Sequence, residues 1–155
     1  MNMTETIIPA TEELLSSFTA VSASAGIPYH RKNIPEDDGI TGIVHLSGQS
    51  TGYVAIHLPT ETAVLVTKLF LFIDSEEIEA EQVCDAVREL ANILAGQLKN
   101  SFDPQGSKIK LSLPMTCQGE DFIVANLPGA EKITIPFYTD DGDFFVEVQL
   151  ASSRH

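Results

Sequence analysis

Basic residues and cysteines are scarce in this sequence of 155 residues. Nine Lys and Arg stand against 22 Asp and Glu, which gives a formal net charge of −13 at pH 7. Binding to a phosphate backbone depends on Lys and Arg, and an anionic membrane surface repels an acidic protein. We therefore expect neither a nucleic-acid partner nor a membrane partner. The two cysteines, Cys84 and Cys117, lie too far apart in the sequence for a CxxC motif and provide no disulfide framework.

Long hydrophobic runs are also missing. The most apolar segment, residues 63–73, is interrupted by Thr67 and Lys68, and it falls short of the about 20 apolar residues that span a bilayer. The first residues, MNMTE, lack the basic region and apolar core of a signal peptide. We therefore expect a cytoplasmic protein that forms a single domain over residues 1–155.

The hydrophobic pattern predicts an α+β fold, a mostly antiparallel sheet packed with three helices. The first helix is predicted over residues 9–25 with Thr11 as its N-cap, and the second is predicted from about residue 60 to 72. Asp74 or Ser75 is the expected cap of a long third helix that ends near residue 102. Strands are predicted at residues 27–33, 40–46, 53–58, 108–113, 122–126, 133–138 and 144–150. The segments 47–52 and 140–143 connect them into two hairpins.

The long helix carries two contrasting faces. At about 100° per residue, its apolar stripe consists of Val83, Val87, Leu90, Leu94 and Leu98. Nearly opposite lie Asp85, Glu89, Asn92, Gly96 and Lys99. A solvated helix face would favour Ala, Glu, Lys, Gln or Arg, and glycine within a helix costs about 1 kcal/mol relative to alanine. Asn92 and Gly96 therefore indicate that this face serves a purpose other than helix stability.

The chemistry of this face suggests contact with another molecule. A missing side chain at Gly96 lets a second surface approach the helix backbone closely. Glu89 and Asn92, one turn apart, then present a negative charge and a neutral amide side by side. Such a pair can bind a cation and orient a water molecule at the same time.

These residues resemble the signature of the CheX/CheC/FliY phosphatases of bacterial chemotaxis. The resemblance rests on Asp85-x3-Glu89-x2-Asn92 followed, after 21 residues, by Pro114. The surrounding segments ELANILAG, residues 89–96, and SLPMTCQG, residues 112–119, are also typical of the family.

The resemblance implies a phosphatase that hydrolyses the aspartyl phosphate of a CheY-type response regulator. It implies that Glu89 pairs with the regulator's active-site lysine and that Asn92 orients the attacking water. Asp85, Gly96, Lys99 and Pro114 are then expected at the contact with the partner. Magnesium belongs to the phosphorylated partner, so the resemblance implies neither a metal site nor a bound cofactor in this chain.

The number of motifs points to one branch of the family. CheC-like members carry a second Glu-x-x-Asn on an earlier helix, whereas Glu12 and Glu13 have no Asn three residues later. The sequence is thus similar to the single-site CheX-like branch, which implies a homodimer joined through the sheets.

Other interpretations of the sequence are a metal site and a binding module without catalytic activity. His45 and His57 could lie across a hairpin from each other, but neither an acid nor a cysteine at ligand spacing completes a metal site. The alternative function is a non-catalytic CheX-like module that binds a receiver domain or a motor-switch component.

Overall fold

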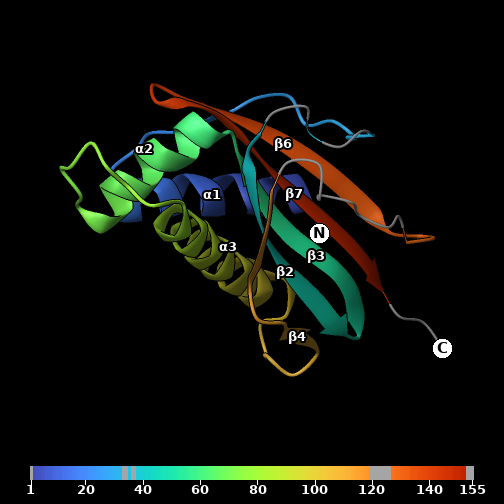
Figure 1. The fold of residues 1–155 in the computed structure, drawn as a ribbon. Coiled ribbons are helices and arrows are strands. Elements are labelled where there is room, and N and C mark those ends of the chain that lie inside the picture. The colour runs from blue at the N-terminus through green and yellow to red at the C-terminus, as the bar shows by residue number, and fades with distance from the viewer. Residues whose placement is uncertain (1, 33–34, 36–37, 119–126, 153–155) are drawn as a thin grey trace.

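In the residues that the computed structural model describes, three helices cover one face of an antiparallel sheet of long and short strands (Figure 1). The structure describes residues 2–32, 35, 38–118 and 127–152. The helices are α1 (Met3–Thr19), α2 (Thr60–Leu71) and α3 (Ala80–Phe102). The strands are β1 (Ser24–Ala25), β2 (Ile40–Gly48), β3 (Ser50–Leu58), β4 (Ile109–Leu111), β5 (Met115–Gln118), β6 (Glu131–Thr139) and β7 (Gly142–Ser152). The predicted α+β fold is therefore confirmed.

The sheet is built around two long hairpins. Its strand order is β1-β6-β7-β3-β2-β4, and β5 also pairs with β2. All these pairings are antiparallel. The predicted loop 47–52 is mostly strand, because Gly48 adopts a φ of 106° and the chain reverses around Gln49 alone. The turn predicted near residues 140–143 is confirmed, since Thr139 and Gly142 pair directly.

Two helices begin elsewhere than predicted. Helix α1 starts at Met3, where the Asn2 side chain accepts hydrogen bonds from the backbone N–H groups of Thr4 and Glu5. Thr11, the predicted cap, is a buried residue within this helix. The helix also ends earlier, at Ala20 in the left-handed conformation.

Helix α3 starts at Ala80 rather than after Asp74 or Ser75. Glu79 and Gln82 form a capping box there. The Ser75 hydroxyl accepts a hydrogen bond from the backbone N–H of Glu77, so a local turn replaces the predicted first helical turn.

Two predicted strands differ as well. Of the predicted strand 27–33, the described residues 27–32 contribute only an isolated bridge between Tyr29 and Thr134, while β1 lies just before them. The strand predicted at residues 122–126 lies outside the described residues. No helix in the described part of the chain is both long and apolar enough to cross a membrane.

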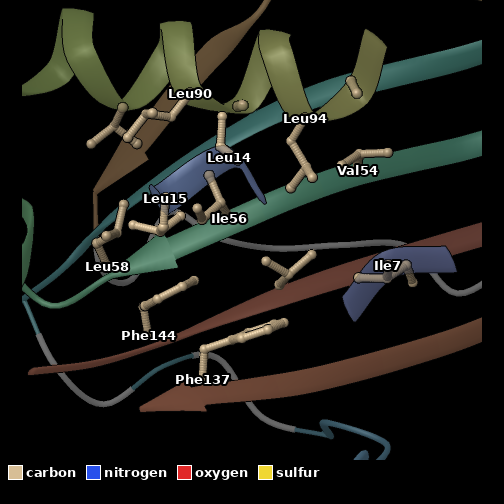
Figure 2. Packing of buried hydrophobic residues seen from close by; sticks show 14 of the residues in the cluster. Ile7, Leu14, Leu15, Val54, Ile56, Leu58, Leu90, Leu94, Phe137 and Phe144 are labelled. Atoms are coloured by element: carbon tan, nitrogen blue, oxygen red, sulfur yellow. The ribbon is translucent and has the colours of Figure 1, made fainter. Parts of the chain in front are cut away.

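The hydrophobic core lies between the helices and the sheet (Figure 2). The predicted apolar stripe of α3 is confirmed, because Val83, Val87, Leu90, Leu94 and Leu98 are all buried. Leu14 and Leu15 of α1 pack from a second helix, and Val54, Ile56 and Leu58 project from β3. The rings of Phe137 and Phe144 stack with centroids 5.2 Å apart between β6 and β7. This core holds α3 by one face and leaves its opposite face outside.

The other face of the sheet buries a charged cluster. Glu147 of β7 has no exposed surface and forms a two-bond ion pair with Arg31, each N–O distance being 2.9 Å. The Tyr53 hydroxyl and the Thr134 hydroxyl also donate to this carboxylate, at 2.6 and 2.7 Å. The two bonds from Arg31 attach its segment to β7, and the other two join side chains of β3 and β6 to the same carboxylate.

Candidate functional site

The outer face of α3 carries five of the six predicted site residues. The core contacts of α3 place Asp85, Glu89, Asn92, Gly96 and Lys99 on the side away from the sheet. Asp85 and Glu89 are exposed, and the other three are half-buried. The helical periodicity of the sequence thus predicted the composition of this face correctly.

Glu89 and Asn92 are the chemically available pair on this face. They lie three residues apart, so their side chains project from adjacent turns. Within the described part of the chain, neither side chain has a hydrogen-bond or ion-pair partner. The Glu89 carboxylate and the Asn92 amide therefore lie side by side, and neither of them is used in contacts that stabilise the described fold.

Asp85 and Lys99 do have roles within the helix. Asp85 forms an ion pair with Arg88 three residues later. Lys99 lies in the last turn of α3, where a positive charge complements the helix dipole. Helix stability thus partly explains Asp85 and Lys99 at the two ends of this face. It does not explain the residues between them.

Gly96 has no packing reason to be glycine. A Cβ atom added at this position meets no other heavy atom within 4 Å. The helical backbone at Gly96 also has no positive φ that would require glycine. The folded chain therefore tolerates a side chain at this position, and the absence of one leaves the helix backbone accessible.

Gly42 of β2 sets the position of α3, and the sequence reasoning missed it. A Cβ atom there would lie 2.8 Å from both the Ala91 Cβ and the Val87 carbonyl oxygen. The helix therefore rests directly on β2 at the level of Glu89 and Asn92. A glycine inside an otherwise apolar strand was the available signal, since it marks a close backbone approach.

A bulge in the edge strand places Pro114. Leu46 pairs with Leu111 and Ile43 pairs with Met115, so the two residues of β2 in between face three on the edge strand. The predicted strand 108–113 therefore ends at Leu111, and β5, which was not predicted, continues the same edge after a break of three residues. Pro114 lies in this break, where its missing N–H leaves no strand bond unmade.

Ser112 stabilises the bulge from within. Its hydroxyl accepts a hydrogen bond from the backbone N–H of His45, and its own N–H donates to the His45 carbonyl oxygen, both at 2.9 Å. The following residue, Leu113, is 85% exposed.

The edge strand and the outer face of α3 form one continuous surface. Helix α3 contacts β5 and β4 as well as β2, and α1 and α2 contact its other side (Figure 1). Since Ala91 faces Gly42, the 100° step between residues turns Asn92 toward the β5 side of the exposed face. Glu89 lies toward the side of α1 and α2. Any partner that covers both side chains also lies close to the β4–β5 edge.

The two strand histidines do not face each other across the hairpin. The register places His45 opposite Tyr53 and His57 opposite Thr41. His57 is buried, its Nδ1 lies 2.7 Å from the Thr41 hydroxyl, and its ring stacks on Phe145. Over the described residues, no group of three or more His, Cys, Asp or Glu is arranged to hold a metal ion.

Comparison with known proteins identifies the family. The model described as "Chemotaxis phosphatase CheX" matches residues 40–138, which is more than half of the chain. The chain belongs to the CheX family. This match includes β2, both strands of the bulged edge and the whole of α3. A sequence comparison with curated proteins gives no match.

Solved CheX structures have the same fold. A chemotaxis protein CheX from Desulfovibrio desulfuricans is 26% identical and aligns over 97% of this chain and 100% of the other, with a TM-score of 0.82. CheX in a CheX–CheY–BeF3–Mg complex from Borrelia burgdorferi is 25% identical over 99% of both chains, with a TM-score of 0.78. FliY from Thermotoga maritima shares the fold at 14% identity, 95% and 84% coverage and a TM-score of 0.62.

Proposed function

We propose that this protein hydrolyses the aspartyl phosphate of a CheY-type response regulator. Glu89 pairs with the active-site lysine of the regulator and fixes the register of the two proteins. Asn92 enters the regulator's site and orients a water molecule in line with the phosphorus atom. Water then forms a bond to phosphorus, and the bond between phosphorus and the aspartyl oxygen breaks. The products are the regulator's free carboxylate and inorganic phosphate.

The division of roles follows from the two side chains. Phosphoryl transfer depends mainly on positioning and on electrostatic stabilisation. An amide can accept one hydrogen bond from a water molecule and donate another, so Asn92 is suited to orient it. Magnesium is bound by the regulator, and this chain needs only to complete the site around it.

One observation carries the proposal: the available Glu89 and Asn92 lie beside an accessible helix backbone in a chain of the CheX family. The Borrelia CheX was solved in complex with CheY, BeF3 and magnesium, which supports a receiver as the partner. An interface alone would require neither the amide nor its position one turn from the acid.

The direct test follows phosphate release from a phosphorylated CheY-type receiver of the same genome, with magnesium. A substoichiometric amount of this protein should accelerate the release and turn over many times. Binding that depends on phosphorylation, without acceleration, would instead support the non-catalytic module. If neither binding nor acceleration occurs with any receiver of that genome, the proposed function is wrong.

Glu89→Ala is expected to weaken binding to the phosphorylated receiver. Removing one partner of a desolvated ion pair costs about 2 kcal/mol or more, which corresponds to ~30-fold in affinity. Titration calorimetry with a BeF3-activated receiver measures this change. Glu12→Ala, an exposed acid on α1, is the matched control and should bind like the wild type. Equal losses in both variants would indicate a general charge effect rather than a specific pair.

Gly96→Ala is expected to change stability and activity in opposite directions. The added Cβ meets open space, and alanine is about 1 kcal/mol better than glycine within a helix. The free energy of unfolding, from urea denaturation, should therefore rise. The rate of dephosphorylation at low receiver concentration should fall, because the methyl group obstructs the partner. Higher stability with unchanged activity would show that no surface approaches this backbone.

The homodimer through the sheets remains a prediction from the family resemblance. Light scattering on the purified protein tests it directly, and a monomer at all concentrations would contradict it.

A further inference from the structure

Helices α1 and α2 expose apolar side chains at one end of the molecule. Leu65, Leu69 and Phe72 follow one another at helical spacing and are 41, 42 and 92% exposed. Phe18 of α1, 41% exposed, lines the same hollow as Leu69 and Phe72, and its ring centroid is 6.1 Å from that of Phe70. We call Phe18, Leu65, Leu69 and Phe72 the α1–α2 patch.

The opposite side of α2 packs against the hydrophobic core. Ala63 and Val66 are buried there, so the exposed leucines are additional to what folding requires. Phe72 also adopts a left-handed conformation, with a φ of 56°, that side-chain-bearing residues rarely take. A nearly fully exposed phenylalanine in such a conformation contributes little to the fold itself.

The α1–α2 patch adjoins two hollows and is bordered by aspartate side chains. A hollow of about 450 Å³ is lined by Phe18, Leu69, Phe72 and Asp74, among others. A second hollow of about 300 Å³ shares Leu69 with the first and is lined by Asp140 and Asp141 of the β6–β7 turn. Figure 1 shows this turn and α2 at the same end of the molecule. Among the described residues, Lys68 is the single cation that lines these hollows. Its ammonium group donates to the Glu76 carbonyl oxygen at 3.4 Å.

Charge decides which kind of molecule fits this surface. An anionic membrane would be repelled by the three carboxylates and by the net charge of −13. A second copy would bring two acidic borders into one interface, because a twofold contact uses the same surface of both copies. A cationic amphipathic segment would satisfy both the apolar side chains and the acidic border.

We propose that the α1–α2 patch is a docking site for a cationic amphipathic helix of another protein. The apolar residues of the docked helix would occupy the two hollows around Leu69. The Lys or Arg residues of that helix would face Asp74, Asp140 and Asp141. This site lies on other helices than Glu89 and Asn92 and does not depend on the proposed function.

The test uses two synthetic helical peptides as probes. Both carry leucine at helical spacing along one face, and the remaining positions are lysine in one peptide and glutamate in the other. Fluorescence anisotropy should show binding of the lysine peptide alone, weakening as salt is added. The variants Leu69→Ser and Phe72→Ser should each weaken it at least ~10-fold, whereas Ile27→Ser, another exposed apolar residue, should not.

Three outcomes would overturn the proposal. Equal binding of both peptides would remove the role of charge, and equal affinity in Phe72→Ser and Ile27→Ser would remove the role of the patch. Self-association that Phe72→Ser abolishes would assign the surface to a second copy. A wild-type circular dichroism spectrum and unchanged receiver dephosphorylation would show that Phe72→Ser is folded. Failure of the docking proposal would therefore leave the proposed phosphatase function unaffected.

Discussion

Asn92→Ala is expected to lower the rate of receiver dephosphorylation by about 10²- to 10³-fold. Losing one preorganised polar group that acts on the transition state has an effect of this size. Asn92 makes no internal hydrogen bond in the described part of the chain, so the fold has no reason to change. Binding to a BeF3-activated receiver should stay within a few-fold of the wild type, because Glu89 still forms its ion pair. Single-turnover phosphate release and titration calorimetry measure the two quantities.

Asn100→Ala is the matched control for this variant. Asn100 lies on the same helix two turns later, is exposed, and lines a hollow next to α1. Its removal should leave the rate unchanged. Wild-type turnover in Asn92→Ala would refute the proposed role of the amide. A parallel loss of binding and rate would make Asn92 a docking residue instead.

Glu147→Gln is expected to lower the free energy of unfolding by about 3–5 kcal/mol near neutral pH. The substitution leaves the Arg31 guanidinium buried without its counter-charge, and a loss of this size is usual when a buried ion pair is broken. Tyr53 and Thr134 also lose a charged acceptor. Urea denaturation followed by circular dichroism measures the change.

The wild type and Glu147→Gln should differ less in unfolding free energy at acidic pH than near neutral pH. Burial raises the pKa of Glu147, but hydrogen bonds from Arg31, Tyr53 and Thr134 outweigh it and hold the pKa below its ordinary value of 4.5. The charged carboxylate thus stabilises the fold above that value, and this contribution disappears as the pH falls through the lower folded pKa. The difference in unfolding free energy between wild type and Glu147→Gln should shrink across that range. A constant difference from neutral to strongly acidic pH would contradict this account.

Much of the candidate site was predictable from local sequence, because one helix carries it. In a helix, the positions of the apolar residues determine which side faces the core. The buried Leu90 and Leu94 therefore place Glu89 and Asn92 on the side of α3 away from the core. The same reasoning failed at the start of α1. Thr11 was the predicted cap, although Asn2 was available as a cap and Met3 and Ile7 continue the apolar stripe on the other side of Pro9. Burial of these residues against the core outweighs the proline.

What local sequence could not predict depends on contacts between distant segments. The depth of α3 on the sheet follows from Gly42, and the bulge at Pro114 follows from the register of β2 with two short strands. The ion pair between Arg31 and Glu147 joins residues 116 positions apart. Periodicity describes which side of an element is apolar, and this suffices to identify the outer face of α3. It contains no information on which elements meet or at what register, because packing across the folded chain sets both.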